Sequence, residues 1–229
     1  MTITTTTLSR AAGLAAVVAG LLFIAVQIKH PHQDIDLVTT TEWQVRYSMK
    51  VAMASLSLIG ITGMYLRQVT QAGVLGLVGY VLFAANYVVL LCVEVVGLAV
   101  LPSIAGSSPG YVSDIIAVGN GGTASGDLGL LETLSTLQGV GYVAGGLVFG
   151  LALLRGKVLA RWAALLLALG TVAAAAIPML PDVNQRLFAI PTGIALIGLG
   201  YSLWSGQRTR AARPVSGPLS LELDPSGAR

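Results

Sequence analysis

Long apolar stretches alternate with short polar ones along most of the chain. A helix needs roughly 20 apolar residues to cross a bilayer, because lipid offers its backbone no other hydrogen-bond partner. The pattern predicts an all-α fold class, a polytopic transmembrane bundle of six helices in residues 11–205, between a polar leader (residues 1–10) and a disordered basic tail (residues 206–229). The expected spans are residues 11–28, 49–66, 74–102, 130–154, 162–180 and 189–205.

Two of the predicted helices need more than a plain span. Thr39 and Glu42 have the spacing of a capping box, so the second helix should start before the membrane does. The third span, residues 74–102, is long enough that it has to tilt or bend if it is helical throughout. In the loop that follows, Tyr111 to Val118 is expected to form a short interfacial helix.

The distribution of positive charge predicts how the bundle is oriented. If the N-terminus is inside, the cytoplasmic segments hold nine of the 13 lysine and arginine residues and the outer segments hold four. Cytoplasmic loops carry such an excess, so both the N-terminus and the C-terminus are expected to be cytoplasmic, in a multi-pass protein of the cell (plasma) membrane.

Composition points to lipid as the main partner. Hydrophobic residues make up 55% of the chain and charged residues 10%, whereas soluble domains carry about 25% charged residues. The net charge of +3 is not gathered in a patch, so we expect no nucleic-acid partner. The repeats Gly141-x-x-x-Gly145 and Gly146-x-x-x-Gly150 predict a tight helix contact, which also offers a surface for oligomerisation.

The order of these signals resembles that of a known group. Short recurring segments open or close the predicted spans at Ser9–Leu14, Met64–Arg67, Leu75–Tyr80 and Val158–Trp162. In this order the chain resembles the bacterial, actinobacterial-type six-helix integral membrane proteins that are classed as domains of unknown function. Those proteins commonly have a proline where this chain has Ala160. The resemblance implies the six-helix fold and no activity.

Three charged residues are expected to lie near one height in the membrane. An ionisable side chain inside a span is costly, at about 2.5–3.5 kcal/mol, and so by default has a partner or a function. Counted by helix rise from the cytoplasmic ends, Lys50, Glu94 and Glu132 all fall near the outer boundary of the hydrocarbon layer. Glu94 and Glu132 are therefore candidate acid and base groups.

Polar and aromatic residues near these charges predict a pocket that opens to the outer face. Tyr80, Tyr87 and Glu94 recur every seven residues and share a helical face. The candidate binding residues are Lys50, Tyr80, Asn86, Tyr87, Gln138, Tyr142, Trp43 and Asp182. A plainer interpretation stands beside this one: Glu94 pairs with Lys50, Glu132 is a helix N-terminal carboxylate, and the tyrosines serve packing.

Other kinds of site find little support. The segment from His30 to Asp36 places His30, His32, Asp34 and Asp36 on alternate positions, as metal ligands in an extended strand would lie, but no second cluster completes such a site. The motifs of nucleotide, dinucleotide and zinc-protease sites are absent from the sequence. We therefore expect no metal and no cofactor.

Two functions remain open at this stage. The first is a protein without catalytic activity that binds a lipid or small hydrophobic molecule near the outer leaflet, or that acts as an accessory membrane subunit. The alternative is a membrane-embedded isomerase or cyclase, acting on an isoprenoid or lipid with Glu94 and Glu132 as acid and base. A transporter is disfavoured, because no broken helices recur in the two halves.

Overall fold

The computed structural model describes the backbone of residues 4–28, 33–175 and 189–211, and side chains up to residue 206. Regular structure in this part of the chain is helical throughout, so the predicted all-α class is confirmed for it. The helices are α1 (Thr5–Gln27), η1 (Ile35–Leu37), α2 (Thr41–Arg67), α3 (Val69–Val95), η2 (Val96–Val100), α4 (Leu101–Ile104), α5 (Pro109–Gly119), α6 (Leu130–Gly156), α7 (Arg161–Ala173) and α9 (Ile190–Ala211).

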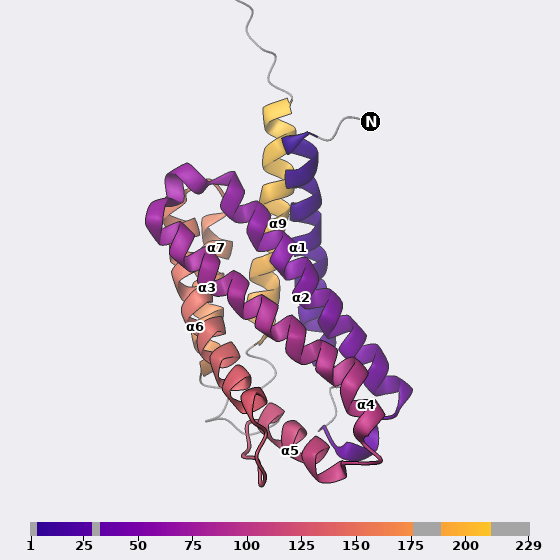
Figure 1. The fold of residues 1–229 in the computed structure, drawn as a ribbon. Helices are drawn as coiled ribbons and strands as arrows, with labels where there is room; N and C mark the ends of the chain where they lie inside the picture. The colour runs from indigo at the N-terminus through magenta and orange to yellow at the C-terminus, as the bar shows by residue number, and fades with distance from the viewer. Residues whose placement is uncertain (1–3, 29–32, 176–188, 212–229) are drawn as a thin grey trace, which may run out of the picture.

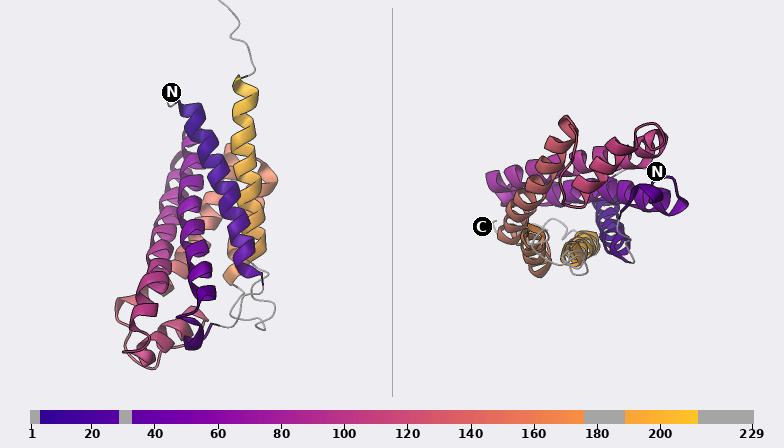
Figure 2. Two further views of the ribbon diagram at one scale, coloured as in Figure 1. Left: turned by 90° about the vertical axis from the view of Figure 1, so that its right-hand side faces the viewer. Right: turned by 90° about the horizontal axis from the view of Figure 1, so that it is seen from below.

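The long helices form a closed ring in chain order. Helix α1 packs on α2, α2 on α3, α3 on α6, α6 on α7 and α7 on α9, and α9 returns to pack on α1 (Figures 1 and 2). The start of α1 and the end of α9 lie together at one end of the bundle, which we call the terminal end (Figure 1). Helices α4 and α5 lie at the opposite end, which we call the acidic end.

Within the described part of the chain, four helices are long and apolar enough to cross a membrane: Thr5–Gln27, Thr41–Arg67, Val69–Ile104 and Leu130–Gly156. They contain or overlap the first four predicted spans. Helix α7 covers only the first part of the fifth, whose remainder, from residue 176, lies outside the described residues. Helix α9 covers the sixth span and runs past its expected end to Ala211.

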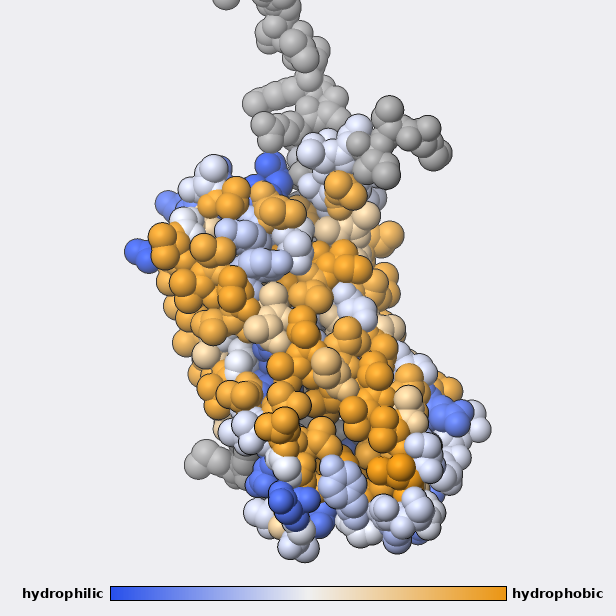
Figure 3. Space-filling view, in the orientation of Figure 1, coloured by the Kyte–Doolittle hydropathy of each residue, from blue (hydrophilic) through white to orange (hydrophobic). Residues whose placement is uncertain are grey.

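The outer surface suits a lipid environment. Val74, Leu77 and Val81 of α3 are 78%, 47% and 52% exposed, and Leu130 of α6 is 78% exposed. On the face seen in Figure 3, hydrophobic residues cover the middle of the bundle and hydrophilic residues gather toward the two ends. Such an apolar surface on a helical bundle is what a membrane-embedded protein requires.

The third span, residues 74–102, is helical throughout but departs from regular α-helix near both of its ends. Gly73 has a positive φ of 57° and breaks the helical geometry near the start of α3. Near the other end the chain widens into the π-helical turn η2 before it continues as α4. The indole Nε1–H of Trp43 donates to the Gly97 carbonyl in this turn at 2.8 Å, which satisfies a buried backbone acceptor.

The start of α2 differs from the predicted capping box by one residue. Thr40, rather than Thr39, is the N-cap, and its hydroxyl oxygen accepts the backbone N–H of Trp43 at 3.3 Å. The shift arises because the turn after η1 ends one residue later, with the Thr40 N–H bonded to the Leu37 carbonyl. The short helix expected over residues 111–118 is present as α5, slightly longer at both ends.

The glycines of α6 serve contacts within the chain. A Cβ atom at Gly145 would lie 2.7 Å from the backbone nitrogen of Phe83 in α3. On another face, Gly146 and Gly150 contact α7 in the same close manner. The tight helix contact predicted from these glycines is therefore found inside the ring, which leaves Gly145, Gly146 and Gly150 covered rather than open to a second molecule.

A second, smaller hydrophobic core holds η1, α4 and α5 against the start of α2 at the acidic end. Its buried residues come from η1, α2, α4 and α5 and are Val38, Trp43, Tyr47, Leu101, Val112 and Ile116. The rings of Trp43 and Tyr47 stack at a centroid distance of 4.3 Å. This cluster holds α5 against the end of the ring, separate from the main core between the long helices.

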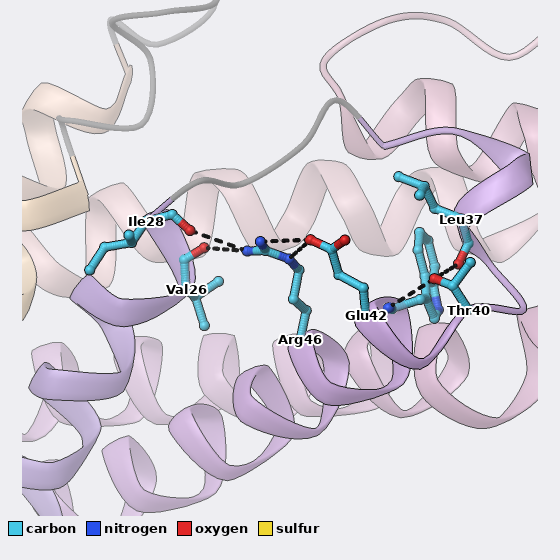
Figure 4. A network of polar contacts seen from close by, with 7 residues as sticks. Val26, Ile28, Leu37, Thr40, Glu42 and Arg46 are labelled. Atoms are coloured by element: carbon cyan, nitrogen blue, oxygen red, sulfur yellow. Dashed lines mark hydrogen bonds and ion pairs between the residues drawn. The ribbon is translucent and has the colours of Figure 1, made fainter.

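An arginine joins the end of α1 to the start of α2 (Figure 4). The Arg46 guanidinium donates to the carbonyls of Val26 and Ile28 at 3.4 and 3.5 Å, and it pairs with Glu42 at 2.8 Å. Carbonyls at a helix C-terminus lack intrahelical partners and attract positive charge. Arg46 therefore fixes the first loop while Glu42 holds its guanidinium in place.

Candidate functional site

A cavity of about 980 Å³ opens inside the ring at the acidic end. Residues of α1, α2, α3 and α6 line it, together with the end of α5 and Gln33 of the first loop. Ala174 and Ala175, which follow α7, and Ala189, which precedes α9, complete the described lining. Helix α6 contributes the largest share of the wall, from Ser135 to Leu147. With a rise of 1.5 Å per residue, this stretch of wall is about 18 Å long.

The lining changes character with depth in the same way on four helices. Toward the acidic end, the side of the cavity that we call its mouth, lie Gln27 of α1, Lys50 of α2, Glu94 of α3 and Gln138 of α6, which we call the polar ring. About one helical turn deeper on the same four helices lie Phe23, Met53, Leu90 and Tyr142, which we call the apolar layer. The cavity is thus amphiphilic, with its polar side toward the mouth.

An ion pair forms one side of the polar ring. Lys50 Nζ lies 3.5 Å from Glu94 Oε2, and the two side chains are 15% and 11% exposed. The same ammonium lies 4.3 Å from the centroid of the Tyr47 ring, a distance that suits a cation–π contact. The predicted alternatives for Glu94 therefore coexist, because the residue pairs with Lys50 and also lines the cavity.

Uncharged polar groups complete the mouth. The Asn120 side-chain Nδ2–H donates to the Gln33 carbonyl at 3.1 Å, which ties the end of α5 to the first loop. On the α6 side, the hydroxyls of Ser135 and Thr136 donate to the carbonyls of Leu131 and Glu132 in their own helix. Each hydroxyl oxygen keeps lone pairs that can accept a further hydrogen bond from a ligand.

Aromatic side chains close the deeper part. The Tyr142 hydroxyl donates to Thr192 Oγ1 of α9 at 2.8 Å, which satisfies its polar end. Its ring stacks on Phe23 at a centroid distance of 6.5 Å and tilts against Phe83 at 6.1 Å. Leu147 and Ala144 continue the wall below Tyr142. This inner region offers mainly apolar surface.

A smaller cavity of about 200 Å³ adjoins the first. It is lined by Tyr47, Gly97 and residues of α5, and it shares Lys50 and Glu94 with the larger cavity. The ion pair therefore borders both spaces. The Trp43 bond to Gly97 fixes the turn that directly follows Glu94, and so helps to aim the carboxylate at Lys50.

The structure brings four of the predicted site residues together in the large cavity: Lys50, Glu94, Gln138 and Tyr142. It does not bring Glu132 there. Glu132 lies exposed in the first turn of α6, where a carboxylate meets the positive end of the helix dipole. Glu94 and Glu132 therefore do not face each other across the cavity as the two-acid prediction requires.

Four other predicted binding residues lie outside the cavity lining. Trp43 belongs to the second core. Tyr80 shares a hydrogen bond of 3.1 Å with Thr62 and stacks on Tyr65 at 4.6 Å. Tyr87 is fully buried in the main core, and Asn86 lies beneath Gly141 of α6. The seven-residue repeat correctly predicts packing toward the protein interior, but only Glu94 of the three reaches the cavity.

The remaining candidates say little about this site. Asp182, His30 and His32 lie outside the described residues. Asp34 caps η1 by accepting the N–H of Ile35, and Asp36 lies in that turn. No group of three or more His, Cys, Asp or Glu side chains that suits a metal is found among the described residues.

Sequence reasoning missed half of the lining pattern. Phe23, Gln27, Met53 and Leu90 look like ordinary span residues, and only their common depth in the folded ring distinguishes them. Gln33 and Asn120 come from loops that the second core brings over the mouth. A polar residue near a span end with an apolar one a turn inward is a weak signal, because most spans show it.

The loop after α5 is ordered by one carboxylate at the acidic end. Asp114 accepts the backbone N–H groups of Ser125 and Gly126, each at 2.9 Å. The bond from Ser125, and to a smaller extent the bond from Gly126, holds the pKa of Asp114 below its usual value. The loop therefore folds back onto α5 and leaves the end of that helix, Gly119 and Asn120, at the mouth.

The arrangement can hold a molecule that is polar at one end and apolar at the other. The described lining contains one ion pair, between Lys50 and Glu94, and no carboxylate other than that of Glu94. Comparison of the chain with protein-family models, with curated proteins and with solved structures gives no match, so its fold and cavity have to be interpreted from their own geometry.

Proposed function

We propose that the chain is a multi-pass protein of the plasma membrane with six spans and both ends in the cytoplasm. The separation of charge along the bundle supports this orientation. Arg67, Arg155, Lys157 and Arg161 lie at turns of the terminal end, whereas the described cations at the acidic end are Arg46 and Lys50. Seven described acids lie at the acidic end: Asp34, Asp36, Glu42, Glu94, Asp114, Asp127 and Glu132. The positive-inside rule then puts the acidic end outside. The same topology supports membership of the six-helix group that the sequence resembles.

In this orientation, the protein binds an amphiphilic lipid or small hydrophobic molecule near the outer leaflet. The observation that carries the proposal is the layered lining, with the polar ring at the mouth and the apolar layer one turn below it. Ligand pockets are commonly about 300–1,000 Å³ and mostly apolar with a few polar groups. A cavity of about 980 Å³ with this lining fits that description at its upper end.

Binding is favoured over the isomerase or cyclase alternative. Acid–base chemistry of the kind expected from the sequence needs two carboxylates within reach of one substrate. Glu94 lies in the cavity wall, but it is paired with Lys50, and Glu132 lies outside the lining. The geometry thus supplies a place to hold a lipid rather than a pair of opposed catalytic groups.

A cavity-filling substitution tests the proposal. Ala144 lines the deep part of the cavity, so Ala144→Trp should fill it, whereas Leu137→Trp adds the same side chain to an exposed position of α6 outside the lining. The full-length protein and both variants would be purified from membranes, and copurified molecules would be identified by mass spectrometry.

We expect one amphiphile to be enriched in the wild type and in Leu137→Trp and to be lost from Ala144→Trp. Equal amounts in all three proteins, relative to bulk membrane lipid, would contradict a cavity ligand. Thermal unfolding of both variants in detergent checks that the filled protein still folds.

A further inference from the structure

We propose that the head of the bound amphiphile is uncharged and rich in hydroxyl or amide groups. This inference rests on the proposed function and adds the chemical class of the ligand. It follows from the charge balance of the polar ring and from the kinds of hydrogen-bonding group around it.

The charges in the lining cancel. Among the described lining residues, Lys50 and Glu94 are the only cation and the only carboxylate, and they face each other at 3.5 Å. The nearest further acid on α6, Glu132, lies outside the lining and is exposed. On α2, Arg46 is engaged by Glu42 and by the end of α1. The described part of the mouth therefore presents no net charge to a ligand.

The other described polar residues of the lining are all neutral. They are Gln27, Gln33, Asn120, Ser135, Thr136 and Gln138, contributed by α1, the first loop, α5 and α6. Amides and hydroxyls supply both donors and acceptors, which match the hydroxyl groups of a glycerol or sugar head. A ring of such groups can satisfy several hydroxyls of one head at once.

A charged head is disfavoured by the same geometry. An anionic head can use Lys50 only by competing with Glu94, which would leave that carboxylate in the cavity wall without its partner. A cationic head would displace Lys50 in the same way. Separating a buried pair in poorly hydrated surroundings is strongly unfavourable, so the pair selects against either charge.

Three probes that share an oleoyl chain separate these cases: monooleoylglycerol with a neutral head, oleate with an anionic head, and oleylamine with a cationic head. The full-length protein would be placed in phosphatidylcholine nanodiscs that contain the three at equal mole fraction. Native mass spectrometry would then measure which probe remains bound. We expect the neutral probe to exceed each charged probe about tenfold in occupancy, equivalent to a modest difference in binding free energy.

Two charge-removing variants test the cause of the preference. Glu94→Gln leaves Lys50 without its carboxylate and should shift occupancy toward oleate. Lys50→Met leaves Glu94 without its ammonium and should shift occupancy toward oleylamine. Because the two shifts are opposite in direction, a general loss of stability cannot imitate them.

The outcomes are distinguishable. If oleate or oleylamine fills the wild-type cavity as well as the neutral probe does, a lipid site exists but the inference about its head is wrong. If all three probes are bound equally by wild type and Ala144→Trp, the cavity holds no amphiphile and the proposed function fails with it. Wild-type selectivity alone decides the matter if either charge variant does not fold.

Discussion

Lys50 Nζ and Glu94 Oε2 lie 3.5 Å apart, on neighbouring helices α2 and α3, and together they form the charged part of the cavity mouth. Removing one partner of a buried pair leaves the other uncompensated. We expect Lys50→Ala and Glu94→Ala each to lower the free energy of unfolding by about 3 kcal/mol. The double variant should cost less than the sum of the two, as measured by a double-mutant cycle in detergent.

The exposed pair Arg46–Glu42 gives the matched control. Glu42 is 52% exposed, so Glu42→Ala should cost about 1 kcal/mol or less. Additive losses for Lys50 and Glu94 would mean that the two side chains do not interact in the folded protein.

The contact between Gly97 and Tyr47 leaves no room for a side chain. A Cβ atom at Gly97 would lie 2.0 Å from the ring of Tyr47, which packs against the π-helical turn. Gly97→Ala should therefore destabilise the protein by about 1–3 kcal/mol through overpacking. Because the same turn positions Glu94, the variant should also reduce the amount of copurified ligand.

Gly139→Ala is the control for that substitution, since no atom lies within 4 Å of the added Cβ in the middle of α6. Alanine favours a helix over glycine by about 1 kcal/mol, so this variant should unfold at the wild-type temperature or above it. Equal losses for the two variants would show that glycine loss itself, rather than the Tyr47 contact, matters.

The Asp114 bonds to the loop make its order depend on pH. The pKa of Asp114 is lowered in the folded protein, so the bonds stabilise the loop at pH values above the ordinary carboxyl pKa. As pH falls through the lowered pKa, the carboxylate is protonated and this stabilisation is lost. The amide resonances of Ser125 and Gly126 should follow that titration in the wild type.

Asp114→Asn should remove this pH dependence and increase cleavage of the loop by an added protease at neutral pH. Asp127→Asn is a suitable comparison, because Asp127 accepts only the nearby N–H of Gly129 in the same loop. Unchanged Ser125 and Gly126 resonances in Asp114→Asn would contradict the role assigned to its carboxylate.

Membrane orientation can be tested with single cysteines. Cys92 is the only cysteine of the chain, so Cys92→Ala provides a background without thiols. Thr123→Cys lies in the loop after α5, and Arg155→Cys lies at the end of α6; both positions are exposed. In intact cells, an impermeant maleimide should label the former and reach the latter only after lysis. The reverse pattern would invert the proposed topology.

The apolar pattern predicts most of the architecture, because a spanning helix is a local property of about 20 residues. The helix at residues 109–119 follows from its flanking turn residues in the same way. The capping residue shifts from Thr39 to Thr40 because it depends on how the preceding turn ends.

The site is only partly predictable. Counting helix rise predicts a common height for Lys50, Glu94 and Glu132, and the structure places the first two in the lining of one cavity. Height does not determine which way a side chain faces around its helix. Glu132 therefore shares the level but points away from the cavity, and Tyr80 turns to Thr62 and Tyr65 of α2. The apolar layer could not be predicted, because its four residues come together only through the packing of four helices around the cavity.

The most direct test of the central claim is to map where each end of a bound amphiphile lies. Monooleoylglycerol carrying a photoreactive diazirine at the end of its chain would be crosslinked to the full-length protein in nanodiscs, and the labelled peptides would be sequenced. We expect labelling of deep residues such as Met53 and Leu147, and labelling of Gln138 and its neighbours when the diazirine is placed on the head. Crosslinks confined to outward-facing residues such as Val74 and Leu77, in wild type and Ala144→Trp alike, would show that the cavity does not hold the ligand.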